Sequence, residues 1–196
     1  IVGAQYKYIK DNVCQKRFLK NTDRSNSLWM TPIEGSKALF VTEDPLDAIA
    51  HSQLFPGARY AYLCTGGTST KAQREMIHSF SQKFKLPIIL GNDNDLAGQL
   101  ENFKLAYHTA NIEYAINSKT QRVLLTVNGA EREWGKDEIV AALQAVMKQR
   151  PNMILSIPWA KDWNDDLRSS KKSISLRIAE NMARVQIETT KSEQRG

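Results

Sequence analysis

The sequence predicts an α/β protein built on a mainly parallel sheet of about four to five strands. Helices are expected on both faces, and a small antiparallel β element is expected ahead of the sheet. Two observations indicate this class: three apolar runs are each followed by a helical pattern, and these runs are continuously apolar instead of alternating. Continuous apolar runs are typical of parallel strands that are buried on both faces. The length of 196 residues suits one such domain with a small addition.

The N-terminal stretch predicts the antiparallel element. The segments GAQYKYIK and QKRFLK alternate polar and apolar residues and are joined by DNVC. This pattern is typical of a β-hairpin. A third short strand is predicted in SLWMTPI, from Ser27 to Ile33.

The three strand-helix units follow in order. Their strands are predicted in ALFVTE, ARYAYLCTG and LPIILGND, and the helices after them in PLDAIAHSQLF, STKAQREMIHSFSQKF and LAGQLENFKLAYHTA. Pro45 falls in the first turn of the first helix, where proline is well tolerated. Ser69 or Thr70 is expected to cap the second helix. A fourth strand is predicted from Ile112 to Ser118.

The remaining elements are a strand in QRVLLTVNG, expected to be exposed, and a helix in GKDEIVAALQAVMKQR that ends at Pro151. A buried strand is predicted in MILSIP, and the last segment predicts a basic amphipathic helix with a polar tail. We therefore expect a basic, β-rich segment at 1–36 and the main domain at 37–168. Within the main domain we expect an insertion around 121–150, and a basic helix and tail follow at 169–196.

The net charge of +6 is concentrated at the two ends of the chain. Residues 1–36 carry six Lys and Arg against three acids, and residues 168–196 carry seven against three. The segment 37–167 is nearly neutral, with fourteen against fifteen. Basic flanks beside an acidic centre suit a polyanion whose reacting end approaches a metal ion. Surface lysines that keep a domain soluble explain the charge equally well.

Several classes of protein are excluded or disfavoured. Neither a long apolar run nor a signal-peptide pattern is present, so we expect no membrane insertion and no secretion. Cys14 and Cys64 lie far apart without metal-ligand spacing, which excludes a zinc ribbon within this chain and fits a reducing, cytoplasmic location. The chain begins at Ile1 and not at Met, and we expect it to be part of a larger multidomain protein.

Acidic residues gather in TEDPLDA, NDND and KDWNDD. In parallel sheets, ligands bind at the carboxyl ends of the strands, and Glu43 and the NDND pair fall at predicted strand ends. In extended backbone Asp93 and Asp95 point the same way, and two carboxylates that close repel each other unless a proton or a cation intervenes. Hard oxygen ligands of this kind suit Mg²⁺ or Mn²⁺. The alternative is that both aspartates only cap the following helix.

The segment from Ala38 to about Leu105 resembles the Toprim domain, a Rossmann-like catalytic module shared by bacterial-type primases, topoisomerases and some nucleases. LFVTEDPLDAIA resembles its first motif in the primase form, in which a glutamate precedes an aspartate by four residues, here Glu43 and Asp47. LCTGGTST is similar to the Gly/Thr-rich turn after the second strand, and ILGNDNDLAGQ to the primase form D-x-D-x-A-G. KDWNDDL looks like the third acidic element of primases, which carries over to Asp162 and Asp165. The basic opening is similar to the segment ahead of the Toprim core in plasmid primases and mobilisation proteins.

The sequence also departs from the family pattern. Glycine usually follows the family glutamate, and here that residue is Asp44. The gap between Asp95 and Asp162 is long for a Toprim core, which is why an insertion is expected. The primase zinc module is missing, and the N-terminal part is too short for a complete primase polymerase lobe. Topoisomerases carry a further acid two residues beyond the D-x-D, where this chain has Ala97.

The resemblance implies distinct roles for these residues. Glu43 is expected to act as general base or acid near a 3′-oxygen, together with Asp93 and Asp95 as catalytic residues. One or two divalent cations, Mg²⁺ or Mn²⁺, are expected to be held by Glu43, Asp47, Asp93, Asp95 and Asp162. Single-stranded DNA and nucleotides are the expected partners. The residues expected to contact nucleic acid are Lys161, Arg168, Lys171 and Lys172.

The leading hypothesis is nucleotidyl transfer, that is, primer synthesis on single-stranded DNA within a larger plasmid, phage or mobilisation protein. The first alternative is a Toprim-type nuclease, which uses the same acids to cleave nucleic acid. The second alternative is a non-catalytic nucleic-acid-binding or scaffolding domain of a conjugative relaxase, for which Asp44 and the insertion are signs of drift.

Overall fold

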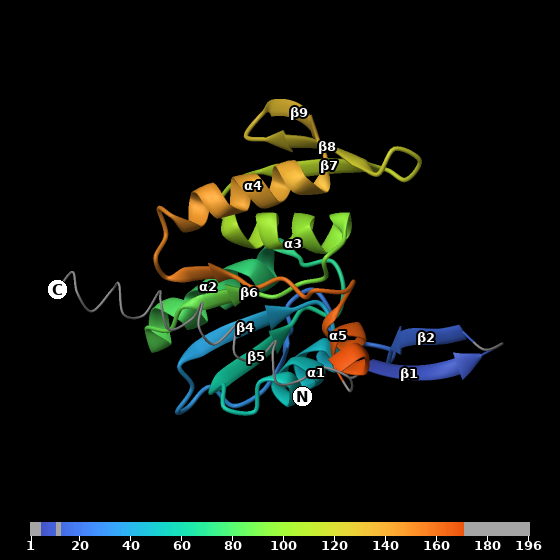
Figure 1. Cartoon of the computed structure of the whole chain (residues 1–196), viewed down its shortest axis with the longest axis vertical. Coiled ribbons are helices and arrows are strands. Elements are labelled where there is room, and N and C mark those ends of the chain that lie inside the picture. The colour runs from blue at the N-terminus through green and yellow to red at the C-terminus, as the bar shows by residue number, and fades with distance from the viewer. Residues whose placement is uncertain (1–4, 11–12, 171–196) are drawn as a thin grey trace.

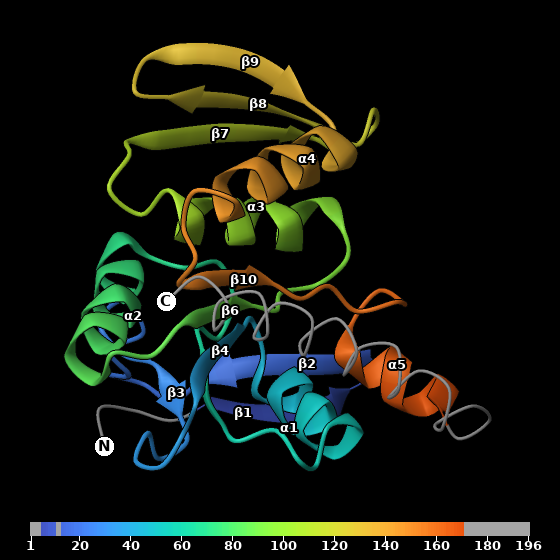
Figure 2. The same ribbon diagram turned by 60° about the vertical axis from the view of Figure 1, so that its left-hand side comes forward.

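The computed structural model describes residues 5–10 and 13–170, so the predicted basic C-terminal helix, with Lys171 and Lys172, lies outside the described residues. Its centre is a five-stranded sheet in the order β10-β6-β4-β5-β3, of which Figure 1 labels the three central strands and Figure 2 the two edge strands. The strands are β3 (Trp29–Met30), β4 (Ala38–Thr42), β5 (Tyr60–Cys64), β6 (Ile88–Leu90) and β10 (Met153–Leu155). All neighbours pair in parallel except β3, which is antiparallel to β5. The predicted mainly parallel sheet is confirmed.

Helices cover both faces of this sheet. They are α1 (Pro45–Leu54), α2 (Lys71–Phe84), α3 (Leu96–Ala106), α4 (Lys136–Met147) and α5 (Trp163–Ser170). On one face, α1 and α5 lie side by side and pack on Phe40 and Tyr62 (Figure 2). On the other face, α2 and α3 pack on Leu39, Val41 and Leu63. Both faces of β4 are therefore buried, which is why its sequence is apolar throughout.

The helix α3 lies in the interior of the molecule. Every residue of this helix is buried except Ala97, because the sheet covers one side and α4 and β8 cover the other. Its polar side chains Gln99, Glu101 and Lys104 are buried as well, and each has a hydrogen-bond or ion-pair partner. A buried polar group costs free energy unless it is paired, so these contacts fix the position of the helix.

A second, three-stranded antiparallel sheet lies outside α3 and α4, with the order β7-β8-β9 (Figure 1). Its strands are β7 (Ile112–Asn117), β8 (Arg122–Val127) and β9 (Ala130–Trp134). The strand predicted at Ile112 forms, but it pairs with β8 and not with the main sheet, where β10 pairs with β6 instead. No helix separates β7 from β8, so the two pair as antiparallel neighbours.

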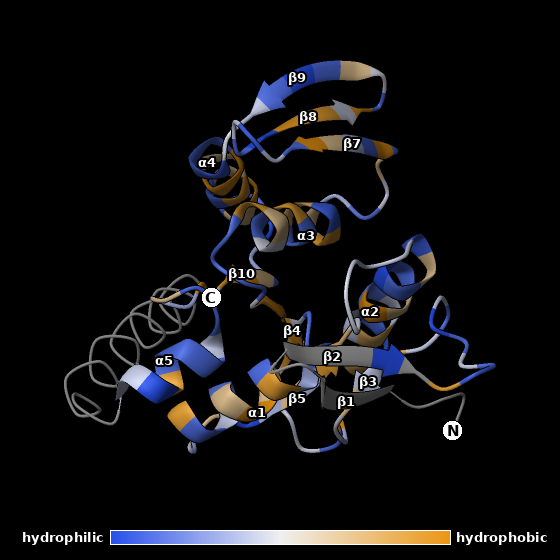
Figure 3. Ribbon diagram, turned by 90° about the vertical axis from the view of Figure 1, so that its right-hand side faces the viewer, coloured by the Kyte–Doolittle hydropathy of each residue, from blue (hydrophilic) through white to orange (hydrophobic). Residues whose placement is uncertain are grey.

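The strand β9 was not among the predicted elements. Asn128 and Gly129, both at positive φ of 51° and 86°, form the tight turn that leads into it. The strand β8 was expected to be exposed, but Val123 and Leu125 are buried against α3 and α4 while Leu124 points to solvent. Figure 3 shows the contrast between the hydrophobic β8 and the hydrophilic β9.

The N-terminal prediction is confirmed at the level of the backbone. The strands β1 (Gln5–Lys10) and β2 (Val13–Phe18) pair antiparallel as a separate two-stranded sheet.

Thr70 caps α2 through a capping box with Gln73, as one of the two expected caps. Within the part of the chain that the structure describes, every helix is too short or too polar to cross a bilayer.

Trp163 anchors α5 to the sheet, and its removal tests the packing of this face. Its indole is 2% exposed and donates from Nε1 to the carbonyl oxygen of Gly91 at 2.8 Å. We expect Trp163→Ala to lower the free energy of unfolding by about 3–5 kcal/mol, and Trp163→Phe by less, because it loses mainly the hydrogen bond. Urea unfolding of the full chain measures both. Trp29→Ala, at a side chain that is 41% exposed, is the control, and an equal loss there would contradict the prediction.

Candidate metal centre

The carboxyl edge of the main sheet brings together loops that are far apart in the sequence. Glu43 directly follows β4, and Asp93 and Asp95 follow β6. The amide of Gly66, in the turn after β5, donates to the carbonyl oxygen of Glu43 at 2.9 Å. The amide of Asn94 donates to the carbonyl oxygen of Lys161, after β10, at 2.7 Å. Backbone hydrogen bonds thus join the Glu43 loop to the turn after β5, and the Asp93–Asp95 loop to the segment that leads to Asp162.

Asp93 is the electrostatic centre of this edge. Burial raises the pKa of its carboxyl to about 7, and repulsion from neighbouring carboxylates adds to the shift. Those carboxylates, in order of decreasing effect, are Asp47, Glu43, Asp95 and Asp162. Four carboxylates from three segments of the chain therefore lie near a fifth. Such an arrangement is unfavourable unless a proton or a cation occupies it.

Asp47 is the second carboxylate of this edge whose charged form is disfavoured. It lies in the first turn of α1, is 7% exposed and accepts a hydrogen bond from Nδ2 of Asn164 at 2.7 Å. Burial raises its pKa to about 6, with further contributions from Asp162 and Asp44. Asp44 caps α1, since its side chain accepts from the amide of Leu46 at 2.9 Å. The residue that replaces the usual glycine therefore has a structural role at the start of the helix.

Asp95 serves partly as a helix cap. Its Oδ1 accepts from the amide of Gly98 at 2.9 Å, and its Oδ2 lies 3.9 Å from Nζ of Lys161. The capping interpretation of the D-x-D pair is thus correct for Asp95. Both members of the Asp95–Lys161 pair are exposed, so the pair is loose and solvent-screened. Its oxygens remain at the edge that holds Asp93.

The third acidic element divides between the site and the surface. Asp162 begins α5 by accepting from the amide of Asp165 at 2.8 Å, and it raises the pKa of both Asp47 and Asp93. Asp165 instead faces Arg168 at 3.4 Å on the exposed side of the helix. It is not among the carboxylates that act on Asp47 or Asp93. The structure therefore brings Asp162 to the edge and leaves Asp165 outside it.

The donor chemistry of the edge fits a hard divalent cation. Its side-chain oxygens are carboxylates, the donors that Mg²⁺ and similar ions prefer, and burial together with mutual repulsion raises the pKa of Asp93 and Asp47. Within the described ranges, no three His, Cys, Asp or Glu side chains lie close enough together to hold a metal ion as they stand. Binding of an ion would therefore require the carboxylates to move closer together, with water or a phosphate completing its shell.

A buried amide network behind Asp93 was missed by sequence reasoning. Gln99 donates from Nε2 to the carbonyl oxygen of Asp93 at 2.8 Å, and Asn92 donates from Nδ2 to Asn102 at 2.8 Å. Asn102 donates in turn to Gln99 at 3.4 Å. All three amide side chains are at most 2% exposed. The signal for them was an unusual number of polar residues in a helix that would have to be buried on both sides.

Gly98 explains the small residue that follows the D-x-D pair. A Cβ at this position would lie 2.7 Å from the backbone nitrogen of Asp93 and closer still to its carbonyl oxygen. The first turn of α3 thus packs directly on the backbone that presents Asp93. Only glycine allows this approach without moving the aspartate.

Two lysines from different elements contact the Asp93–Asp95 loop. Lys161 was predicted to contact nucleic acid, and its Nζ faces Asp95. Lys136, the first residue of α4, was not predicted, and its Nζ lies 3.3 Å from Oδ1 of Asn94. Arg168 is paired with Asp165 at the surface, and its contact with nucleic acid stays a prediction. Lys136 lies in the segment around 121–150 that the sequence predicts to be an insertion, and no motif connects this segment to the acids.

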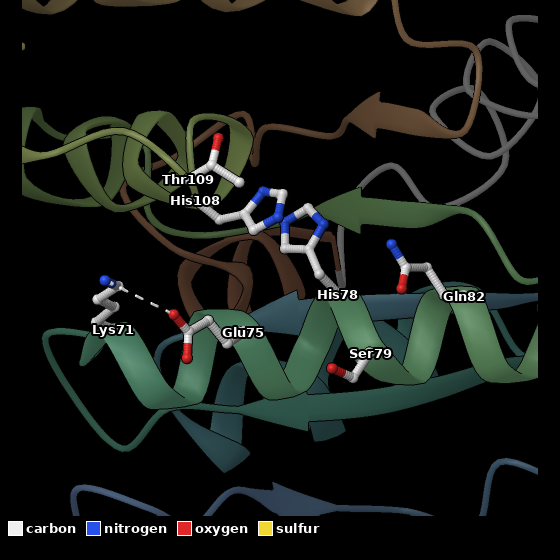
Figure 4. Close-up of a pocket in the computed structure, with 7 residues that line it drawn as sticks. All are labelled: Lys71, Glu75, His78, Ser79, Gln82, His108 and Thr109. Carbon is white, nitrogen blue, oxygen red and sulfur yellow. Dashed lines mark ion pairs between the residues drawn. The ribbon is translucent and has the colours of Figure 1, made fainter. Parts of the chain in front are cut away.

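A pocket of about 340 Å³ lies away from the acidic edge, between α2 and the turn after α3 (Figure 4). Its lining residues are Lys71, Glu75, His78, Ser79, Gln82, His108 and Thr109. The rings of His78 and His108 stack with centroids 3.4 Å apart and planes at 13°. Their in-plane nitrogens therefore do not converge on one point. None of the predicted site residues lines this pocket.

The raised pKa of Asp93 predicts a pH dependence of stability in the absence of divalent ions. A folded-state pKa of about 7 against 3.8 for the unfolded chain means that this group favours the folded state most at low pH. Its contribution is lost as the pH rises from about 4 to about 7. We expect Asp93→Asn to raise the free energy of unfolding above that range by on the order of 1 kcal/mol, after discounting for solvent screening.

Thermal unfolding in a chelator and in excess Mg²⁺ measures this effect. The ion should stabilise the wild type and not Asp93→Asn, since only a site that binds the ion responds to it. Asp165→Asn, at an exposed pair outside the edge, should change neither value by more than about 0.5 kcal/mol. A chelated Asp93→Asn protein less stable than the wild type at high pH would contradict the electrostatic argument.

The contact of Gly98 with Asp93 yields a further prediction. Gly98→Ala should weaken Mg²⁺ or Mn²⁺ binding by calorimetry at least tenfold, because the added Cβ displaces the backbone of Asp93. Ala97→Gly, at the one exposed residue of α3, changes the neighbouring position and should cost at most about 1 kcal/mol of stability with binding unchanged. Equal metal affinities of the two variants would show that the close approach is not required.

Comparison with known proteins agrees with the geometry of this edge. Residues 40–123 match the model of a family described as Toprim-like. The matched segment runs from β4 into β8 and includes Glu43, Asp47, Asp93 and Asp95, whereas Asp162 lies beyond it. No curated protein and no solved structure matches the chain. Residues 40–123 are thus similar to Toprim-like domains, and the acids at the carboxyl edge of the main sheet lie mainly within this stretch.

Proposed function

We propose that this chain is the metal-dependent Toprim module of a primase-like protein. In this proposal it transfers nucleotides in primer synthesis on single-stranded DNA, as part of a larger plasmid, phage or mobilisation protein. The observation that carries the proposal is the position of Asp93 among four other carboxylates at the carboxyl edge of a parallel sheet. Strongly perturbed carboxylates that gather at a ligand-binding edge are typical of functional sites.

The metal ligands of this proposal are Asp47, Asp93, Asp95 and Asp162, with Glu43 beside them. When bound, Mg²⁺ or Mn²⁺ neutralises charge on the transferring phosphoryl group and favours in-line displacement. Asp93 and Asp47 are the strongest candidates, since repulsion and burial strain both of them. Asp95 uses one oxygen as a cap and offers the other, while the amide network behind Asp93 holds its backbone in place.

Glu43 is the proposed proton acceptor. The 3′-hydroxyl oxygen of the growing strand attacks the α-phosphorus of a nucleoside triphosphate, a P–O bond forms, and the bond to the leaving pyrophosphate breaks. The hydroxyl proton passes to the carboxylate of Glu43. Glu43 follows β4, and its carbonyl oxygen accepts a hydrogen bond from the amide of Gly66. Its carboxylate lies near enough to Asp93 to raise the pKa of that residue. A base whose backbone is held at this position suits proton transfer from an oxygen bound at the same edge.

Two observations favour a catalytic role over a scaffold that has kept only the fold. Asp44 caps α1, so a structural role at the start of the helix is sufficient to explain the departure from glycine. The crowded carboxylates reduce stability in the absence of an ion, and a chain under no catalytic constraint would gain stability by losing one of them.

The direct test is incubation of the full chain with single-stranded DNA, nucleoside triphosphates and Mn²⁺. New oligonucleotides are the expected product, and Glu43→Gln and Asp93→Asn should lower their yield at least 100-fold, because one removes the base and the other a ligand. Glu131→Gln, at an exposed residue of β9, is the control and should retain wild-type yield.

Two outcomes would overturn the primase assignment. Shortened template without new oligonucleotides would identify a nuclease that uses the same acids. Calorimetry that shows no Mg²⁺ or Mn²⁺ binding at millimolar metal would instead support the scaffolding role. Loss of metal binding in Asp93→Asn, with binding retained in Glu131→Gln, is the result expected for the proposed centre.

A further inference from the structure

Trp159 is an exposed aromatic residue next to the candidate metal centre. Its side chain is 53% exposed, against 41% for Trp29 and 2% for Trp163. It lies two residues before Lys161, whose carbonyl oxygen binds the amide of Asn94. An exposed indole leaves a large apolar surface in water and offers a flat face for stacking. The backbone of Trp159 therefore belongs to the segment that is hydrogen-bonded to the Asp93–Asp95 loop.

The backbone that presents Trp159 is held in place from several directions. The amides of Trp159 and Ala160 donate to the two carboxylate oxygens of Asp166 at 2.8 and 2.7 Å. Asp166 itself is only 4% exposed. The amide of Ser156 donates to the carbonyl oxygen of Leu90 at 2.9 Å. A rigid frame around an exposed aromatic lowers the entropy cost of binding, so the loop is pre-organised for a ligand.

Positive charge accompanies the aromatic residue at this edge. Nζ of Lys161 faces Asp95 from the same loop, and Nζ of Lys136 lies 3.3 Å from Oδ1 of Asn94. Both lysines therefore contact the acidic loop. Proteins that bind single-stranded nucleic acid combine these two features, because bases stack on aromatic rings and lysines attract the phosphates.

We propose that Trp159 stacks on a base of single-stranded nucleic acid that crosses the Asp93–Asp95 loop, with backbone phosphates at Lys136 and Lys161. This inference rests on the proposed function, because it identifies how the substrate strand is held at the same centre. Trp159 contributes affinity that depends on the presence of a base. The two lysines contribute affinity that depends on charge and salt and not on the base.

The test measures fluorescence anisotropy of the full chain with two labelled probes: an oligothymidine and an abasic oligonucleotide of equal length. Trp159→Ala should weaken binding of oligothymidine about tenfold and leave binding of the abasic probe unchanged. Trp159→Phe should retain most of the affinity, since its ring still stacks. Phe84→Ala removes another exposed aromatic side chain, at the C-terminal end of α2, and should bind both probes as the wild type does.

The lysines give an independent reading with the same probes. Lys136→Ala and Lys161→Ala should each weaken both probes alike and lower the slope of log Kd against log salt by about one. Indole fluorescence adds a direct signature of stacking: oligothymidine should quench the wild type more than Trp159→Phe. Equal quenching of the two proteins would count against stacking at this residue.

The outcomes separate this inference from the proposed function. Trp159→Ala should retain Mg²⁺ binding by calorimetry, so an absence of metal binding in the wild type would refute the catalytic proposal without affecting the comparison of probes. Equal loss on both probes in Trp159→Ala, or no loss on either, would overturn the stacking role. Tighter binding to an oligothymidine–oligoadenosine duplex than to oligothymidine would also overturn it, because paired bases are not available to the indole.

Discussion

The structure holds several carboxylates together at one edge of the main sheet, where they are at least partly buried and repel one another. Asp93 is held among Asp47, Glu43, Asp95 and Asp162, and its burial together with repulsion from these carboxylates raises its pKa to about 7. The backbone of Asp93 is held in this unfavourable position by contacts from α3. Gln99 binds the backbone of Asp93, and Gly98 allows α3 to pack against it. The buried core of both sheet faces supplies the stability that makes such an arrangement tolerable.

The segment around 121–150, which the sequence predicts to be an insertion, takes part in this arrangement. Its strands β8 and β9 pair next to β7 and pack with α4 on the outer side of α3, and α3 in turn carries the buried amides that hold Asp93. The same insertion brings Lys136 to the acidic loop. This segment therefore helps to bury α3 and supplies a lysine to the acidic loop. Its removal would expose the apolar outer face of α3.

The sequence predicted the strands β4, β5 and β6, their burial on two faces and the acids that follow β4 and β6. These features follow from local patterns, such as the apolar run before Asp93 and the capping box at Thr70. The prediction failed where long-range pairing decides, because β7 and β10 are both apolar strands and only tertiary contacts show which one pairs with β6. The strand β9 could have been found, since Asn128 and Gly129 are a recognised hairpin signal.

The candidate site shows the same division. Glu43, Asp47 and Asp93 could be selected because motif spacing places them at strand or helix ends. The dual position of Asp95, as both cap and edge carboxylate, follows from the geometry of the first turn of α3 and not from spacing. Lys136 and the frame around Trp159 depend on loops that meet only in three dimensions. Nothing in the sequence distinguishes Trp159 from the other three tryptophans, because exposure decides its role and composition does not reveal exposure.

The pairing of β10 with β6 has a consequence for biosynthesis. β6 leaves the ribosome long before β10, and until β10 arrives the backbone edge of Ile88, Ile89 and Leu90 is open to any other extended peptide. The nascent chain therefore passes through a stage in which a fully apolar strand needs protection, for example by a chaperone. A fragment that stops where the family match ends, at residue 123, would retain this stage permanently and would be expected to aggregate.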